Sequence, residues 1–254
     1  MKIAVCIKQV ITRDAQVRPD EARTWIRDGD AEFEMNEPDA YALEAALRLR
    51  EAHGGEVIAV SAGPARVTQV LREALARGAD RAIHVEGDAL PQADAFVVAE
   101  ALASAIAPEA PDLVLTGLQS DDMGFGQTGV VLAERLGVPH ATIIMDVQVE
   151  NGRLRVKREL EGGWFQWLEM PLPALVTIQS GINQLRYATL KGIMAAKKKE
   201  IRSVAAPAGQ PALRVIDLRA PGKQKETRMI GGTPAEAAKE LVRALREDAR
   251  VVAS

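Results

Sequence analysis

The stretch TGLQSDDMGFGQTG, residues 116–129, is the part of the sequence best suited to hold a ligand. It lies between a strand-like run and a segment with helical spacing. Its glycines let the backbone approach an anion closely, and Gln127, Thr128 and the amides of the helix start suit a phosphate. Asp121 and Asp122 would repel a pyrophosphate unless they face ribose hydroxyls or backbone amides. A flexible loop with a helix N-cap is the alternative interpretation.

The same stretch also matches the dinucleotide fingerprint G-x-G-x-x-G at Gly124, Gly126 and Gly129. Asp146 follows near the end of the next predicted strand, where an acid that binds ribose is expected. In the fingerprint, however, the first glycine closes the strand itself, whereas Gly124 lies seven residues beyond Gly117. An NAD-dependent oxidoreductase is therefore the second hypothesis, and a nucleotide-sensing regulatory module of the same fold class is the third.

Two other turns follow or precede predicted strands in ways that suit a nucleotide. The segment VSAGP, residues 60–64, is a strand, a small-residue turn and a helix start. The segment MNEPDAYALE, residues 35–44, places Asn36 and acidic side chains at a helix entrance, and a simple N-cap is the alternative for Asn36. With residues 6–10 at the end of the first strand, we expect four loops to converge on one nucleotide.

Catalytic groups are scarce in the sequence. The three histidines, His53, His84 and His140, lack ligand spacing to cysteine or carboxylate, so no metal site is expected. No P-loop and no nucleophile elbow occur. Cys6 lies inside a strand-like run, where a buried and inert thiol is expected. These features predict a binding protein or a carrier, not an enzyme.

Composition excludes several other classes of protein. The chain has 254 residues, a formal net charge of −3, 47 % hydrophobic and 26 % charged residues, which is globular composition. The near-neutral charge argues against nucleic-acid binding. No apolar run reaches ~18 residues, so no membrane insertion is expected. The single cysteine and the opening MKIAVCIK, too short for a signal peptide, predict a soluble cytoplasmic protein without a targeting presequence.

Short β-type runs alternate with helical patterns through most of the chain. Strands are predicted at residues 3–7, 57–60, 82–85, 113–115 and 142–147, and helices at residues 43–50, 67–75, 95–106 and 130–136. Pro64 and Gly78 are suited to start and stop the second of these helices. The alternation predicts an α/β fold, a Rossmann-like three-layer parallel sheet with helices on both faces.

The pattern changes after residue 147. Asn151-Gly152 between apolar alternations predicts an added β-hairpin. An extended run at 175–178 and a helix-compatible stretch at 186–200 follow, then a Pro-, Gly- and Ala-rich arm at 203–225 and an amphipathic helix at about 234–248. We therefore expect residues 1–202 to form a nucleotide-binding domain. Residues 203–254 are expected to form a C-terminal arm and helix that dock on a partner subunit.

Several blocks of sequence resemble one family, the β subunit of electron transfer flavoprotein. The resemblance covers almost the whole chain and rests on the blocks IAVCIKQV, MNEPDAYALEAALRLRE, EVIAVSAGPA, ALARGADRAIHVE, DLVLTGLQSDD…GQTG, VKRELEGG…PALVT and RYATLKGIMAAKKKEI. It implies an electron carrier that forms a heterodimer with an α subunit. The α subunit holds most of the FAD, and the β subunit holds a structural AMP.

The resemblance also implies which residues contact AMP: Cys6, Asn36, Glu37, Pro38, Asp39, Ala62, Gly117, Gln119, Ser120, Asp121, Asp122, Gly124, Gly126, Gln127 and Thr128. Electron-bifurcating members carry a second FAD in place of AMP, and their loop usually lacks the ending Gln-Thr-Gly. This sequence keeps that ending, which favours AMP. It departs from the commonest family form of the loop, which carries three consecutive acids and an Asn before Gln-Thr-Gly.

A recognition loop at residues 187–199 is the second site that the resemblance implies. In the family this loop anchors acyl-CoA or other flavin dehydrogenases, which places the carrier in fatty acid β-oxidation with a quinone oxidoreductase as electron acceptor. Leu190 is the expected apolar anchor. The other expected partner-binding residues are Tyr187, Ile193, Met194, Lys197, Lys198 and Lys199. Core packing of Leu190 and a solvated helix end at the lysines are the alternative interpretations.

Overall fold

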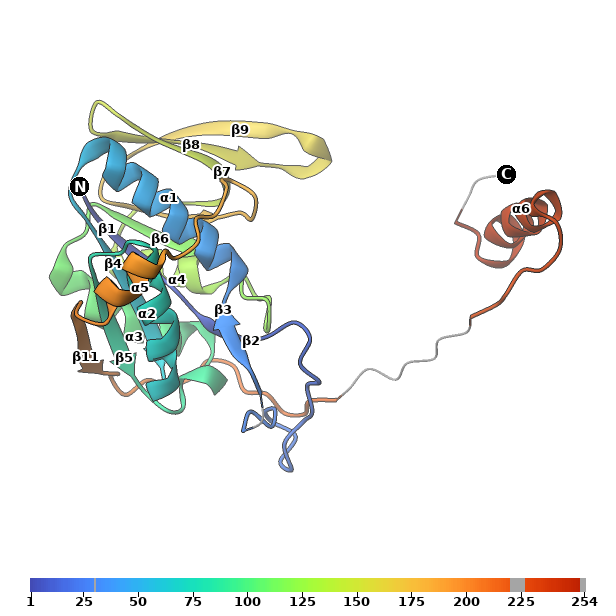
Figure 1. The fold of residues 1–254 in the computed structure, drawn as a ribbon, viewed down its shortest axis with the longest axis horizontal. Coiled ribbons are helices and arrows are strands. Elements are labelled where there is room, and N and C mark those ends of the chain that lie inside the picture. The colour runs from blue at the N-terminus through green and yellow to red at the C-terminus, as the bar shows by residue number, and fades with distance from the viewer. Residues whose placement is uncertain (30, 220–226, 252–254) are drawn as a thin grey trace. The chain divides into compact units, whose positions relative to one another are not determined.

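One nine-stranded sheet organises the chain, of which the computed structural model describes residues 1–29, 31–219 and 227–251. The strand order is β11-β5-β4-β1-β6-β10-β7-β8-β9. Figure 1 shows β11 at one edge of the sheet and the β8–β9 ribbon at the other. The parallel part comprises β1 (Lys2–Cys6), β4 (Glu56–Gly63), β5 (Arg81–Glu86), β6 (Leu113–Gly117), β7 (His140–Glu150), β10 (Ala174–Ile178) and β11 (Ile201–Ala205). The strands β8 (Arg153–Glu159) and β9 (Phe165–Pro171) add an antiparallel ribbon.

Helices cover both faces of this sheet, which confirms the predicted three-layer α/β fold. One apolar core joins alternate strand residues to α1 (Glu37–His53) and α2 (Thr68–Arg77). The opposite residues pack on α3 (Ala95–Ile106) and α4 (Thr128–Leu136). A short helix, α5 (Leu190–Ala196), lies against α2. The central strands β1, β4, β6 and β10 are buried on both faces, as their Val-, Ile-, Leu- and Ala-rich runs require, whereas the edge strand β11 is only partly buried.

Local signals explain where the helices begin and end. Helix α2 starts after a 3₁₀ turn at Ala65–Val67 that follows Pro64, and it ends at Gly78, whose φ of 134° suits only glycine well. Asp94 caps α3 by accepting a hydrogen bond from the amide of Val97. Further short 3₁₀ turns occupy Leu90–Gln92, Ala107–Glu109 and Glu161–Gly163.

The predicted hairpin is present and is longer than the sequence suggested. Asn151 and Gly152 both have positive φ, 51° and 73°, and join β7 to β8 as a primed turn requires. The third strand of the ribbon, β9, was missed, because its exposed residues do not alternate with a full apolar face. Two short strands, β2 (Gln9–Ile11) and β3 (Phe33–Met35), were also missed and pair with each other.

The predicted arm requires a correction at its start. Residues 201–205 form β11, which pairs with β5 along its whole length, so residues 203–205 belong to the sheet and not to a linker. Beyond it, the amides of Ala212 and Leu213 bond to Asp94. The first compact unit accordingly runs from Met1 to Leu218, past the expected boundary at residue 202, and the second from Arg219 to Ser254.

The second unit contains the predicted C-terminal helix. Helix α6 (Pro234–Arg243) continues as a π-helical turn at Ala244–Asp248. Thr233 and Glu236 form a capping box at its start, which satisfies amides that have no partner within the helix. Residues 220–225 of the predicted arm, and the chain end at 252–254, lie outside the described residues.

The order of the strands fixes where a ligand site is expected. From β1 the chain proceeds outward to β4 and β5 on one side, and then crosses to β6 on the other side, where β7 and β10 are added; β11 joins the edge beside β5 last. The switch in direction therefore lies between β1 and β6. Ligands of open α/β sheets bind outside the carboxyl ends of the strands at such a point. Among the described residues, no helix is long and apolar enough to cross a membrane.

Candidate functional site

The loops expected to form a nucleotide site meet at one edge of the sheet. Cys6 ends β1 and is paired in register with Val60 of β4, while Val5 is paired with Leu115 of β6. Ala62, near the end of β4, and Gly117, at the end of β6, therefore extend past the same edge as Cys6. The start of α1 joins them there, because side chains of its first turn bond to the loops after β1 and β6.

Asn36 holds the glycine-rich loop in place. Its side-chain amide donates to the carbonyl of Gln119 at 3.0 Å, and its side-chain oxygen accepts from the amide of Asp121 at 2.9 Å. The side chain is almost completely buried and makes no cap bond to α1, although Asn36 stands at the N-cap position. Asn36 is therefore not a simple N-cap, and both polar atoms of its side chain already have partners in the protein. Asn36 instead shapes the loop that would contact the ligand.

Asp39 joins two neighbouring strand ends. Its carboxylate accepts from the amide of Lys8 at 2.7 Å and from the amide of Gly117 at 2.8 Å. Burial raises the pKa of this carboxyl to about 6, against the opposing effect of these amides. A Cβ on Gly117 would lie 2.4 Å from a carboxylate oxygen of Asp39, so only glycine permits this approach. The amides of Lys8 and Gly117 are thus already used within the protein.

The acidic pair of the loop is neutralised by Lys8, which the sequence analysis included only within residues 6–10, and by Arg13, which it did not include. The ammonium of Lys8 pairs with Asp122 at 2.6 Å and reaches the hydroxyl of Ser120 at 3.2 Å. Arg13 pairs with Glu37 and, at 3.4 Å, with Asp121. A cation directly after the first strand was the available signal. The acids therefore do not oppose an anion as strongly as their sequence alone implies.

The loop between β6 and α4 spans residues 118–127 and presents backbone to solvent. Gly124 and Gly126 have φ of 65° and 64°, a left-handed conformation that favours glycine. Gln127 lies just before α4, and Thr128 is its first residue. The first amides of a helix have no carbonyl partner within it, and the helix dipole adds positive potential there. This end of α4 therefore suits the phosphate that the sequence predicts.

The dinucleotide fingerprint is not formed by these glycines. Residues 118–127 separate the end of β6 from α4, whereas the fingerprint joins strand and helix by one tight turn. Asp146 lies on β7, and β10 stands between β7 and β6, so this acid does not end a strand next to β6. Its carboxylate accepts from the side chain of Gln148 at 3.2 Å. The structure gives the NAD-dependent reading no support.

Cys6 has the environment of a structural thiol. Its side chain is buried against the layer of α3 and α4. Burial, and secondarily the charge of Asp39, raises the pKa of its thiol far above the ordinary value. A thiol that stays protonated is a poor nucleophile. Among the described residues, no group of three or more His, Cys, Asp or Glu side chains is arranged to hold a metal ion.

The expected recognition loop forms a separate surface on the α1–α2 side of the sheet. Leu190 is 79 % exposed and Tyr187 is 87 % exposed, and Ile193 and Met194 are each about half exposed. Core packing of Leu190 is therefore excluded in this chain. Lys197 and Lys198 are exposed. Lys199 has a different role from the one expected, because its ammonium donates inward to the carbonyls of Leu75 and Ala79.

Comparison with known proteins identifies the family. Residues 24–209 match the Electron transfer flavoprotein domain. The chain is similar to three proteins named electron transfer flavoprotein subunit beta. One from Methylophilus methylotrophus is 39 % identical, over 97 % of this chain and 98 % of that protein. One from Homo sapiens is 37 % identical, over 99 % of this chain and 99 % of that protein. One from Bacillus subtilis is 34 % identical, over 99 % of this chain and 100 % of that protein. The chain therefore belongs to the electron transfer flavoprotein family, among its β subunits, and is an electron carrier subunit and not a catalyst.

Proposed function

We propose that this chain binds AMP as a structural ligand at the carboxyl edge of β1, β4 and β6. The observation that carries the proposal is the convergence of Cys6, Ala62, the start of α1 and the loop 118–127 on the switch point of the sheet. The residues offer complementary chemistry for a mononucleotide. The start of α4 suits the phosphate, and the small side chain of Ala62 leaves room for a flat base beside the backbone.

The supporting residues divide into those that would touch AMP and those that shape its site. Gln127 and Thr128, with the first amides of α4, would hold the phosphate. Asn36 and Asp39 bond to the protein's own backbone and fix the loops. Lys8 and Arg13 neutralise the acidic residues of the loop. AMP performs no redox chemistry, so its contribution in this site is to fill and order the edge of the sheet.

The adenylate assignment is tested by releasing the bound nucleotide. The purified protein is denatured with acid, and the supernatant is separated by chromatography against AMP, FAD and NAD standards. We expect one AMP per chain. One FAD per β chain without AMP contradicts the proposal and indicates the alternative, an electron-bifurcating subunit. The ending Gln127-Thr128-Gly129 favours AMP over this alternative.

We further propose that the chain pairs with an α subunit, which holds most of the FAD, and that the heterodimer accepts electrons from acyl-CoA or other flavin dehydrogenases. A quinone oxidoreductase is the proposed acceptor, and fatty acid β-oxidation the proposed process. The FAD supplies the redox chemistry when it is bound. The β chain alone should bind FAD poorly, since aromatic residues make up only 4 % of the sequence. A cytoplasmic location stays a prediction from the sequence.

The docking surface for dehydrogenases is proposed to be the segment 187–199. Its exposed apolar side chains, above all Leu190, share this short segment with the exposed cations Lys197 and Lys198. A small apolar contact with surrounding charge gives fast, electrostatically steered association and fast release. An electron shuttle needs both.

A further inference from the structure

The docking segment has little apolar support of its own. Residues 184–189 form neither helix nor strand, and in α5 only Ala196 is buried. Leu185 packs partly against the apolar core, but an open pocket of about 640 Å³ lies between residues 184–189, α1 and α2, and Arg48, Arg77 and Arg186 line it. Exposed anchors that stand on an irregular backbone over a cavity need another means of fixation, because every freedom they retain must be lost on docking.

Arg186 crosses this gap as a forked ion pair. Its guanidinium bonds to Glu44 through Nε at 2.7 Å and Nη2 at 3.2 Å, and to Glu51 through Nη1 at 2.5 Å and Nη2 at 3.1 Å. Both carboxylates belong to α1. Paired contacts of this kind fix the plane of the guanidinium as well as its distance. The residue directly before Tyr187 is therefore tied to a long, buried helix.

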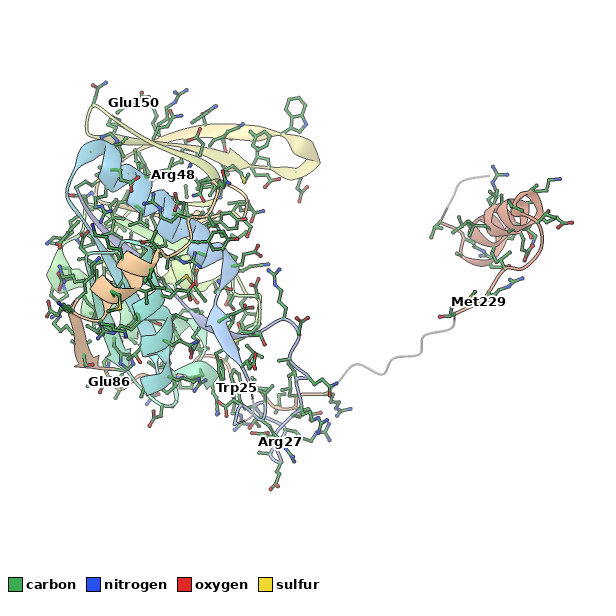
Figure 2. The ribbon with its side chains drawn as sticks, in the orientation of Figure 1. Trp25, Arg27, Arg48, Glu86, Glu150 and Met229 are labelled. Atoms are coloured by element: carbon green, nitrogen blue, oxygen red, sulfur yellow. The ribbon has the colours of Figure 1, made fainter. Side chains whose placement is uncertain are left out.

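Glu44 is the buried centre of this arrangement. Glu44 is only 4 % exposed, and burial alone would raise the pKa of its carboxyl. The hydrogen bonds from Arg186 and Arg48 outweigh burial and hold the pKa of Glu44 below its ordinary value. Arg48, labelled on α1 in Figure 2, bonds to Glu44 at 2.7 Å and to the carbonyl of Gln184 at 2.9 Å. Two arginines thus connect one buried carboxylate to the start of the segment.

The other end of the segment is fixed to α2. Arg72 donates to the carbonyls of Ala196 at 2.6 Å and Lys199 at 2.8 Å. A Cβ on Gly192 would lie 2.3 Å from the carbonyl oxygen of Ala76, so α5 touches the backbone of α2 directly. With both ends held, the direction of Tyr187 and Leu190 depends on the short stretch that Arg186 anchors.

We propose that Arg186 is a positioning residue for docking: through Glu44 and Glu51 it fixes the backbone that presents Tyr187 and Leu190 to a partner dehydrogenase. The inference rests on the proposed function of the segment 187–199. Arg186 itself need not touch the partner. It acts by reducing the conformational freedom that docking would otherwise have to remove.

The test compares Arg186→Gln and Arg186→Lys in the assembled heterodimer with an acyl-CoA dehydrogenase as electron donor. Arg186→Gln should raise the KM for the carrier about tenfold with kcat unchanged, the size of effect expected from lost preorganisation of a few side chains. Arg186→Lys keeps the charge but not the fork, so its KM should lie between. Amide hydrogen exchange over residues 187–196 should quicken in the same order.

A matched control is Arg135→Gln. Arg135 pairs with Glu100 at 3.2 Å on α4 and α3, the layer on the opposite face of the sheet, so its loss should leave KM and the exchange of 187–196 unchanged. Melting temperatures of all variants are compared, and kinetics are normalised to folded protein. A lower melting temperature with an unchanged KM for Arg186→Gln shows a merely structural ion pair and overturns the inference.

Leu190→Ala separates failure of the inference from failure of the proposed function. If it raises KM while Arg186→Gln does not, the segment docks and Arg186 does not position it. If Leu190→Ala leaves KM unchanged, the segment is not the docking site, and the inference is overturned together with that proposal. In the double variant, positioning predicts an effect smaller than the sum of the two single effects, because the truncated Leu190 gains nothing from being fixed, while Tyr187 still does. Additive effects overturn it.

Discussion

Single side chains decide which backbone groups at the carboxyl edge are left for a ligand. The sequence predicted Asn36 and Asp39 as ligand contacts. The structure gives them protein partners instead, Asp121 for Asn36 and Lys8 and Gly117 for Asp39, which lie 85, 31 and 78 residues away along the chain. Residue type and local spacing identify such polar groups as important. They do not reveal a partner so distant in sequence. A side chain that contacts the ligand therefore could not be distinguished from one that holds a loop of the site in place.

Asp39 gives a prediction about pH. Its pKa is raised from 3.8 to about 6 in the folded chain. A carboxyl with a raised folded pKa favours the folded state most when it is protonated. Its contribution to the free energy of unfolding is therefore full below about pH 4 and is lost as pH rises through 6, by about 3 kcal/mol at most. Relative to Asp39→Asn, the natural chain should lose stability across this interval in denaturant titrations.

Asp94 provides the matched control for that measurement. Burial acts to raise the pKa of Asp94, but hydrogen bonds from the amides of Val97, Leu213 and Ala212 outweigh it and lower the pKa. Its contribution to stability is present at neutral pH and is lost on acidification below its ordinary range. The Asp94→Asn comparison should therefore stay nearly flat between about pH 4 and 6 and show the opposite slope only at lower pH. A flat comparison for Asp39 would show that the two amides compensate its burial fully.

At the scale of elements, the sequence predicts the buried strands and helices and misses a strand that lies at the edge of the sheet. Strands such as β1 and β4 carry continuous apolar residues, and α2 and α3 carry an apolar stripe, so their patterns identify them. β11 has the short, mixed sequence IRSVA before a Pro- and Gly-rich stretch. Ile201 and Val204 pack partly against the cores, and backbone hydrogen bonds to β5 hold the strand in the sheet. Backbone hydrogen bonds of this kind can form with almost any sequence, so no residue pattern predicts them.

Helix α5 carries the prediction for docking. Leu190 is 79 % exposed at its first position, so Leu190→Ala removes no contact from the core. It should remove about 2 kcal/mol of apolar contact from the docked complex. At about 1.4 kcal/mol per decade, this slows reduction by an acyl-CoA dehydrogenase more than tenfold at limiting concentration. The melting temperature and the flavin spectrum of the heterodimer should not change.

Leu71→Ala is the counterpart for that experiment. Leu71 is fully buried on α2, so its truncation leaves a cavity. The melting temperature should fall by several degrees, on the scale of about 2–5 kcal/mol for such a change. Electron transfer per folded molecule should stay intact. If Leu190→Ala behaved like Leu71→Ala, the exposed leucine would be part of the fold and the docking assignment would be wrong.

At the scale of the whole molecule, the chain consists of two units of very different kinds. The first, Met1–Leu218, contains both apolar cores. The second, Arg219–Ser254, holds one helix, of which no described residue is buried. The sequence predicted that helix because Thr233 and Pro234 mark its start and an apolar stripe follows. It does not reveal which surface covers the stripe, since that surface belongs to another chain under the proposed heterodimer.

Helix α6 has an exposed apolar stripe that could pack on a surface of another chain. Its capping box and the pairs of Arg243 with Glu240 and Glu247 favour the helix locally, yet Leu241 and Val242 stay about half exposed. A helix this short is marginal in water without packing. We therefore predict that deletion of residues from Pro234 onward weakens assembly with the α subunit. Because none of the described core residues of Met1–Leu218 belongs to α6, the melting temperature of that unit should be unchanged.

Point variants of α6 make the last prediction specific to its apolar stripe. Replacing Leu241 and Val242 with alanine should weaken assembly nearly as much as the deletion, because the stripe supplies the contact area. Lys239→Ala, on the polar side, should leave it unchanged. Affinity is measured by titrating the α subunit into each β variant and following complex formation by analytical ultracentrifugation. Full assembly of the deletion variant would show that α6 contributes nothing to the heterodimer and would contradict the proposed role of the C-terminal unit.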